Sequence, residues 1–174
     1  MAKSRLNLQA YQQGILERLQ QVTAEPEANR SRLAVYAGSE RYLLDLRDIS
    51  EVLPVPTIQA VPLVQPWFMG MANIRGNLYA ITDLARFLGV SQQAAVITVE
   101  SRVLIVHGDF GINAGFLIDS LAGLRSLDEF KLLNMVADVP SHVAGRYEDQ
   151  QHYQWEVLDI ALILEKKEFL QVAA

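Results

Sequence analysis

The sequence predicts a mainly β fold made of two related small β-barrels with short helices. From Ser31 onward, apolar and polar residues alternate in short runs that are separated by turns rich in glycine and proline. Many short strands with few helical patterns between them favour small barrels over a sheet of βαβ units. The second observation is an internal echo, because "DLARFL" at 83–88 is matched by "DIALIL" at 159–164.

The repeat extends upstream of the two matching segments. A glycine precedes each of them at nearly the same distance, Gly70 before Asp83 and Gly145 before Asp159. Both copies are therefore expected to form a strand, a turn, a second strand and a helix. Each aspartate is expected to be a helix N-cap, because its carboxylate accepts hydrogen bonds from free backbone N–H groups. The turn at 75–77 has no counterpart in the second copy, so the unit does not need it to fold.

The first 29 residues differ from the rest of the chain. Their apolar residues recur every three or four positions, which predicts an amphipathic helix followed by a linker: Leu8, Tyr11, Ile15, Leu19 and Val22. Docking of this helix on its own domain and binding of a partner are both open. We expect an N-terminal helix and linker over 1–29, one domain over 30–170 and a tail over 171–174.

Strands and turns follow one another closely within the domain. The proline-rich segment 48–66 favours an edge strand that leads into an extended crossing segment, because proline lacks the N–H that a central strand needs. Helices are expected between Asp83 and Gly89 and over 160–172. In chain order the other strands are expected at 32–38, 41–46, on both sides of the turn at 75–77, and at 94–101, 102–108, 114–120, 122–127, 143–147 and 155–159.

The composition excludes several classes of protein. Hydrophobic residues make up 51% of the 174 residues, which favours a packed core over disorder. Apolar runs end well before the ~18 residues of a membrane-spanning helix, and no secretory signal is visible, so we expect a cytoplasmic protein without membrane insertion. The absence of cysteine excludes disulfides and thiolate chemistry. A net charge of −5 disfavours a nucleic-acid partner.

The side chains that usually carry catalysis are scattered. His107, His142 and His152 lack the helical spacing of a metal site, and no serine has the setting of an activated nucleophile. No glycine-rich loop has the pattern that cradles a phosphate. We therefore predict no catalytic residue, no metal, no cofactor and no enzyme activity. The competing hydrolase interpretation requires a cleft in which titratable groups converge.

One arginine is prominent because no catalytic group lies beside it in the sequence. The stretch "MGMANIRGNLYAITDL", residues 69–84, has the pattern of a hairpin whose turn contains Arg75 and Gly76. Gly76 permits a positive φ, which directs the preceding side chain outward. Two interpretations are open: an ion pair with Glu51 or Asp48, or an exposed guanidinium that anchors a protein interface among apolar neighbours. Since no chemistry explains the arginine, we favour the interface.

Four segments follow one another in a characteristic order: "YLLDLRDISEVL" (42–53), "PTIQAVPLVQPWFMGMANIRGNLYAITDLARFLG" (56–89), "LIVHGDFGINAGFLIDSLAGL" (104–124) and "WEVLDIALIL" (155–164). This order resembles the CheW-like domain family of chemotaxis coupling proteins. The resemblance implies two five-stranded SH3-like barrels around a shared core and no catalysis. It also implies an adaptor between the cytoplasmic tip of a methyl-accepting chemoreceptor and the regulatory domain of a CheA-type histidine kinase.

Site residues follow from the family motifs. Arg75 and Gly76 match an Asn-x-Arg-Gly turn and Glu51 a Glu-Val position, both associated with receptor binding, and Ile74 adjoins them. The kinase-facing residues are not identified. In the strand that matches the family's Val-Asp-Ser-Val segment, Ile118 and Asp119 are expected to serve the core more than a contact.

The N-terminal extension and the "WEVLD" ending are more similar to members that serve type IV pilus (twitching motility) systems than to flagellar ones. The chain also departs from the family, with Ala80-Ile81-Thr82 in place of Pro-Val and with a loop at 148–154 and a helix within 1–29 that a minimal member lacks. This loop and this helix are expected to offer a contact with pilus machinery. The alternatives are a flagellar coupling protein and a small-barrel nucleic-acid or ligand binder. The latter would need basic grooves with exposed aromatic residues. Here Trp67, Phe68, Phe87 and Phe116 are expected in the core.

Overall fold

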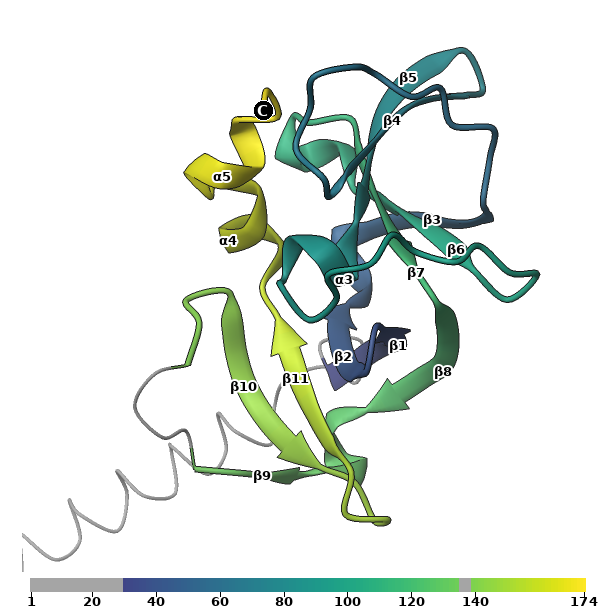
Figure 1. The fold of residues 1–174 in the computed structure, drawn as a ribbon. Helices are drawn as coiled ribbons and strands as arrows, with labels where there is room; N and C mark the ends of the chain where they lie inside the picture. The colour runs from purple at the N-terminus through teal and green to yellow at the C-terminus, as the bar shows by residue number, and fades with distance from the viewer. Residues whose placement is uncertain (1–29, 135–138) are drawn as a thin grey trace, which may run out of the picture. The chain divides into compact units, whose positions relative to one another are not determined.

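The computed structural model describes residues 30–134 and 139–174 (Figure 1). The helix that the sequence predicts within 1–29 lies outside the described residues. The chain divides into two units after Arg30, and the strands and helices of the domain belong to the second unit, Ser31–Ala174.

Short strands dominate this unit. In chain order the elements are β1 (Ser31–Ala37), β2 (Glu40–Asp45), η1 (Leu46–Asp48), β3 (Ile49–Pro54), β4 (Phe68–Ile74), β5 (Asn77–Asp83), α3 (Leu84–Phe87), β6 (Arg102–Val106), η2 (Gly108–Phe110), β7 (Ala114–Ile118), β8 (Ser120–Ser126), η3 (Leu127–Glu129), β9 (Lys131–Leu132), β10 (Val143–Glu148), β11 (Gln154–Leu158), α4 (Ile160–Leu164) and α5 (Lys167–Leu170). The prediction of a mainly β fold with short helices is confirmed.

The strands form two sheets. One has the order β3-β6-β7-β5-β4, and the other has the order β8-β1-β2-β11-β10-β9, in which the sixth strand, β9, is only two residues long. Each sheet contains one parallel pairing, β5 with β7 and β11 with β2, among antiparallel ones. The proline-containing strand β3 lies at a sheet edge, as its composition predicts.

The internal repeat is visible in the hydrogen bonding of both sheets. In each copy the strand register shifts just before the glycine of the repeat. The shift lies between Phe68 and Gly70 in β4 and between Val143 and Gly145 in β10. The segment that precedes each hairpin also bonds to it in the same way. Gln59 N donates to Met71 O at 2.8 Å in the first copy, and Leu133 N donates to Arg146 O at 2.9 Å in the second.

Gly70 is required where the crossing segment meets β4. Its φ is +136°, a conformation that side chains with a Cβ rarely adopt, and an added Cβ would overlap the carbonyl group of Gln59. The two backbone hydrogen bonds between Gln59 and Met71 therefore depend on this glycine, because they bring the crossing segment against the strand. Gly145 has no such requirement, since an added Cβ there would meet only the ring of Tyr147.

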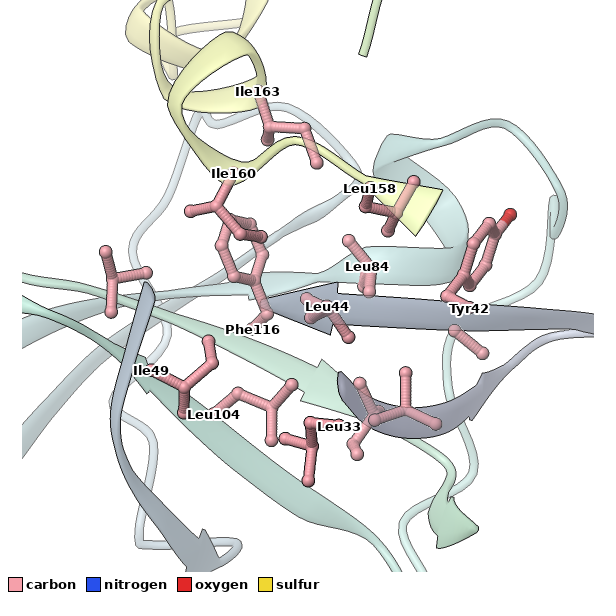
Figure 2. Packing of buried hydrophobic residues seen from close by; sticks show 14 of the residues in the cluster. Leu33, Tyr42, Leu44, Ile49, Leu84, Leu104, Phe116, Leu158, Ile160 and Ile163 are labelled. Atoms are coloured by element: carbon pink, nitrogen blue, oxygen red, sulfur yellow. The ribbon is translucent and has the colours of Figure 1, made fainter. Parts of the chain in front are cut away.

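The two sheets share one hydrophobic core (Figure 2). Leu33 and Leu44 come from one sheet, Leu104 and Phe116 come from the other, and Ile160 comes from α4. The aromatic residues that the sequence predicts to be internal form an extension of this core. Phe169 stacks on Trp67 with 6.0 Å between ring centroids and also contacts Phe87 and Phe116. Phe68 lies against Trp67.

Two predicted elements are wrong. Residues 94–101 form no strand, although Val96, Ile97 and Val99 have high β-propensity. These three side chains are 80%, 51% and 92% exposed, so no packing supports their propensity at this place. Residues 160–172 form two short helices instead of one. In a continuous helix Phe169 would point away from Ile160, since 169 − 160 is nine positions of about 100° each. The break at Lys166, whose ψ is 132°, brings Phe169 into the core.

The residues expected to form a C-terminal tail bond to the crossing segment. Gln65 N donates to Val172 O at 2.8 Å, and Ala174 N donates to Leu63 O at 3.0 Å.

Candidate partner-binding site

The β4–β5 hairpin ends in a two-residue turn. Ile74 pairs with Asn77, and between them Arg75 and Gly76 have φ values of +53° and +86°. Two consecutive positive φ values are the signature of a type I′ turn, which matches the right-handed twist of the strands. The backbone N–H of Gly76 donates a hydrogen bond of 2.9 Å to Oδ1 of Asn73 on β4, and this bond closes the turn.

The guanidinium of Arg75 reaches the far edge of its own sheet. Its Nη2 lies 2.5 Å from Oε1 of Glu51 on β3, which is the first strand in the order β3-β6-β7-β5-β4, whereas the hairpin supplies the last two. The ion pair therefore joins the two ends of the sheet. The partner is Glu51 and not Asp48. Of the two interpretations, the ion pair is thus present, yet the side chain of Arg75 is 75% exposed and that of Glu51 is 30% exposed.

An ion pair of this exposure contributes little to stability, about 0–1 kcal/mol. It uses one terminal nitrogen of the guanidinium, and no described residue accepts a hydrogen bond from Nε or Nη1 of Arg75. Those N–H groups are directed to solvent in a planar arrangement that suits a carboxylate or a carbonyl group. The arrangement is therefore better suited to binding than to holding the fold together.

The surroundings of Arg75 are only partly apolar. Ile74, which immediately precedes the turn, is half-buried against a small cluster inside the sheet that includes Ala72 and Ile81. Leu78, which follows the turn on β5, remains 57% exposed. The site thus combines a charged group with an exposed apolar side chain, a composition that is common at protein interfaces.

The other residues singled out in the sequence have local structural contacts. Asp83 is the N-cap of α3 and accepts hydrogen bonds from Arg86 N and Ala95 N, both at 3.2 Å. Burial raises the pKa of its carboxyl group. Asp159 is the N-cap of α4 and accepts from Leu162 N at 3.0 Å. Ile118 is buried in the core. Asp119 accepts from Gly38 N at 2.8 Å.

The three histidines belong to different segments of the fold. His107 caps η2, His142 is buried before β10, and His152 lies in the β10–β11 loop, 3.1 Å from Glu148. Within residues 30–134 and 139–174, no three side chains of the metal-ligating types come together. No helix among these residues is long and apolar enough to cross a membrane.

Asn73 is the residue that sequence analysis missed. Its amide oxygen closes the turn that presents Arg75, although only the arginine and the glycine of the motif were singled out. The signal was available, because an asparagine side chain readily accepts a hydrogen bond from a backbone N–H of a nearby turn.

Comparison with known proteins shows the family to which the chain belongs. The sequence matches the CheW-like domain over residues 32–168, and the chain therefore belongs to the CheW-like family, whose members are coupling or scaffold proteins of chemosensory systems and are generally non-catalytic. The fold agrees with this assignment. The crystal structure of the scaffolding protein TtCheW from Thermoanaerobacter tengcongensis has a TM-score of 0.66 at 19% identity, over 80% of this chain and 95% of that one.

Among curated relatives, protein PilI of Pseudomonas aeruginosa is 29% identical over 140 residues, which are 78% of this chain and 76% of PilI. The chemotaxis protein CheW of Thermotoga maritima is 28% identical over 95 residues, or 54% of this chain and 60% of that protein. The CheW of Bacillus subtilis is 21% identical over 150 residues, or 84% of this chain and 94% of that protein. Similarity to PilI is in line with the resemblance to pilus-linked members.

Proposed function

We propose that the protein is a non-catalytic adaptor that couples a chemoreceptor to a CheA-type histidine kinase in an array that controls type IV pilus twitching motility. The observation that carries the proposal is the exposed guanidinium of Arg75 on a strained turn of a CheW-like domain. Non-glycine residues with positive φ concentrate at functional sites, because the strain costs stability. The proposed contact with the receptor's cytoplasmic tip consists of Glu51, Ile74, Arg75 and Gly76.

A coupling contact of this kind has to be specific and reversible. An interface of about 1,200–1,600 Å² that is centred on a few anchors meets both needs. Arg75 has the properties of such an anchor, since it is exposed and most of its donors have no acceptor among the described residues. Binding of the kinase's regulatory domain takes place elsewhere on the domain in this proposal.

The proposal includes the location of the protein. It works in the cytoplasm, recruited to membrane-associated receptor arrays, without inserting into the membrane and without a cofactor or a nucleic-acid partner. The domain over 30–170 carries the coupling, and the extension over 1–29 and the loop at 148–154 adapt it to the pilus system.

Substitution of Arg75 tests the receptor contact. We expect Arg75→Ala to weaken binding of a receptor cytoplasmic fragment by about 2 kcal/mol, roughly 30-fold, because the anchor is lost. The melting temperature should stay close to that of the wild type, since an exposed ion pair adds little stability. Isothermal titration calorimetry measures the affinity, and a thermal melt measures the stability.

Arg125→Ala is the matched control. Arg125 is also an exposed arginine with a glutamate partner, Glu129, at 3.1 Å, but it lies on the other sheet. The Arg125→Ala variant should bind the receptor fragment with the affinity of the wild type. Unchanged affinity of Arg75→Ala would rule out the proposed site, and an equal loss in Arg125→Ala would point to a nonspecific charge effect.

The pilus assignment needs a separate experiment, because one coupling fold serves several outputs. Affinity purification of the tagged protein from its native cells should recover a chemoreceptor and a CheA-type kinase, and deletion of its gene should reduce twitching zones on agar. Loss of swimming chemotaxis with normal twitching would instead assign the protein to the flagellar system.

A further inference from the structure

One side chain of β4, that of Asn73, forms a hydrogen bond with the turn that presents Arg75. Asn73, on β4, is exposed, so packing does not fix its position. Its Oδ1 nevertheless accepts a hydrogen bond of 2.9 Å from the backbone N–H of Gly76, three residues later. The bond spans Arg75 and connects the strand to the second residue of the turn.

This hydrogen bond compensates for an unfavourable backbone conformation at Arg75. A type I′ turn favours asparagine followed by glycine at its two central positions, because both need positive φ. Here the first central position is Arg75 with φ +53°. The left-handed conformation costs a residue with a Cβ about 1–2 kcal/mol. Without a compensating interaction, the turn at Arg75 and Gly76 would adopt other backbone conformations. In those conformations the guanidinium would lie in a different position.

The second copy of the repeat has a comparable contact at the equivalent position. Glu148 lies three residues after Gly145, just as Asn73 lies three residues after Gly70. The carboxylate of Glu148 approaches His152 Nδ1 at 3.1 Å, and His152 also has a positive φ, +64°. In both copies, the same position of the hairpin thus directs a side chain to its own tip.

We propose that Asn73 is a positioning residue, which keeps the turn closed so that Arg75 is already oriented for its partner. This inference rests on the proposed function of Arg75. Asn73 acts through the backbone of Gly76 and does not itself touch the receptor. Preorganisation of this kind raises affinity because fewer conformations are lost on binding.

Two variants separate the effect of the hydrogen bond from that of the side chain. Asn73→Ala removes the acceptor, and Asn73→Asp keeps an acceptor of the same length. We expect Asn73→Ala to weaken binding of the receptor cytoplasmic fragment about 3- to 10-fold and Asn73→Asp to restore most of the affinity. In NMR hydrogen exchange, the Gly76 amide should exchange faster in Asn73→Ala than in the wild type or in Asn73→Asp.

The double variant Asn73→Ala/Arg75→Ala completes the test, because a residue that acts only through Arg75 has no effect once Arg75 is gone. The double variant should bind like Arg75→Ala alone. A further loss would show that Asn73 contacts the receptor directly and would overturn the inference. Wild-type affinity of Asn73→Ala beside weak binding of Arg75→Ala would overturn the inference alone, whereas wild-type affinity of Arg75→Ala would overturn the proposed function as well.

Discussion

The hairpins β4–β5 and β10–β11 share one framework and differ at their tips. In both, an aspartate at the end of the second strand caps a helix, and its N–H bonds back to the residue before the first strand. Asp83 N donates to Trp67 O and Asp159 N donates to His142 O, each at 2.8 Å. The first tip is a two-residue turn, and the second is the loop between Glu148 and Gln154.

The second tip is held by hydrogen bonds from its own backbone and side chains to one carboxylate. Asp149 accepts hydrogen bonds from Gln151 N, Tyr153 N and Trp155 Nε1 at 2.8–2.9 Å. The guanidinium of Arg41 lies 4.1 Å from the centre of the Tyr153 ring, a favourable cation–π geometry. Within residues 30–134 and 139–174, the side chain of Arg75 in the first tip bonds only to Glu51. The comparison teaches that the framework tolerates very different tips, so the chemistry of the first tip is free to serve binding.

The largest expected difference between the copies concerns their glycines. Gly70→Ala should lower the free energy of unfolding by roughly 3 kcal/mol, because it forces a positive φ on alanine and separates the crossing segment from β4. Gly145→Ala should cost only about 1 kcal/mol, since the neighbouring Tyr147 ring can move. Urea unfolding followed by circular dichroism measures both. Equal costs would show that Gly145 is as constrained as Gly70.

The helix caps are expected to differ by less. Asp83→Ala should destabilise the domain by about 2 kcal/mol, because its buried carboxylate accepts hydrogen bonds from both Arg86 N and Ala95 N. Asp159→Ala should cost about 1 kcal/mol, since Leu162 N is the single donor to that side chain among the residues that the structure describes. Thermal and urea unfolding of the two variants provide the test. A larger loss in Asp159→Ala would contradict this ranking.

The smallest effect is expected from pH. His142 takes the place that Trp67 has in the first copy, and burial, with a contribution from Lys166, lowers its pKa from 6.5. Below pH 6.5 the unfolded chain therefore binds a proton that the folded chain excludes, so this residue reduces stability as the pH falls. His142→Leu should lose less stability than the wild type between pH 7.5 and 5.5 in urea unfolding. Parallel losses would show that His142 does not contribute.

Local patterns predicted those parts of the fold that depend on local sequence. Strands at 32–38, 41–46, 102–108 and 114–120, and the repeat itself, agree with the structure within a few residues. The prediction of a strand at 94–101 was wrong because β-propensity takes effect where side chains pack against neighbours, and sequence periodicity does not reveal that Val96, Ile97 and Val99 stay exposed. The helix break at Lys166 likewise depends on where the core needs Phe169.

The candidate site was predictable to a similar degree. The turn residues Arg75 and Gly76 were evident from the sequence, and Glu51 was one of two candidate partners. The choice between Glu51 and Asp48 depends on which of two carboxylates near the start of the same edge strand reaches the hairpin, a property of the tertiary fold. The role of Asn73 depends on a hydrogen bond that becomes identifiable only once the turn type is known.

The chain has two tryptophans, and each belongs to a different copy of the repeat. Trp67 stacks with Phe169 and Phe87, and Trp155 packs with Tyr36 and Phe130. Each indole is thus a natural fluorophore for its own half of the domain, so variants that retain only one of them would reveal whether the halves melt together or one after the other.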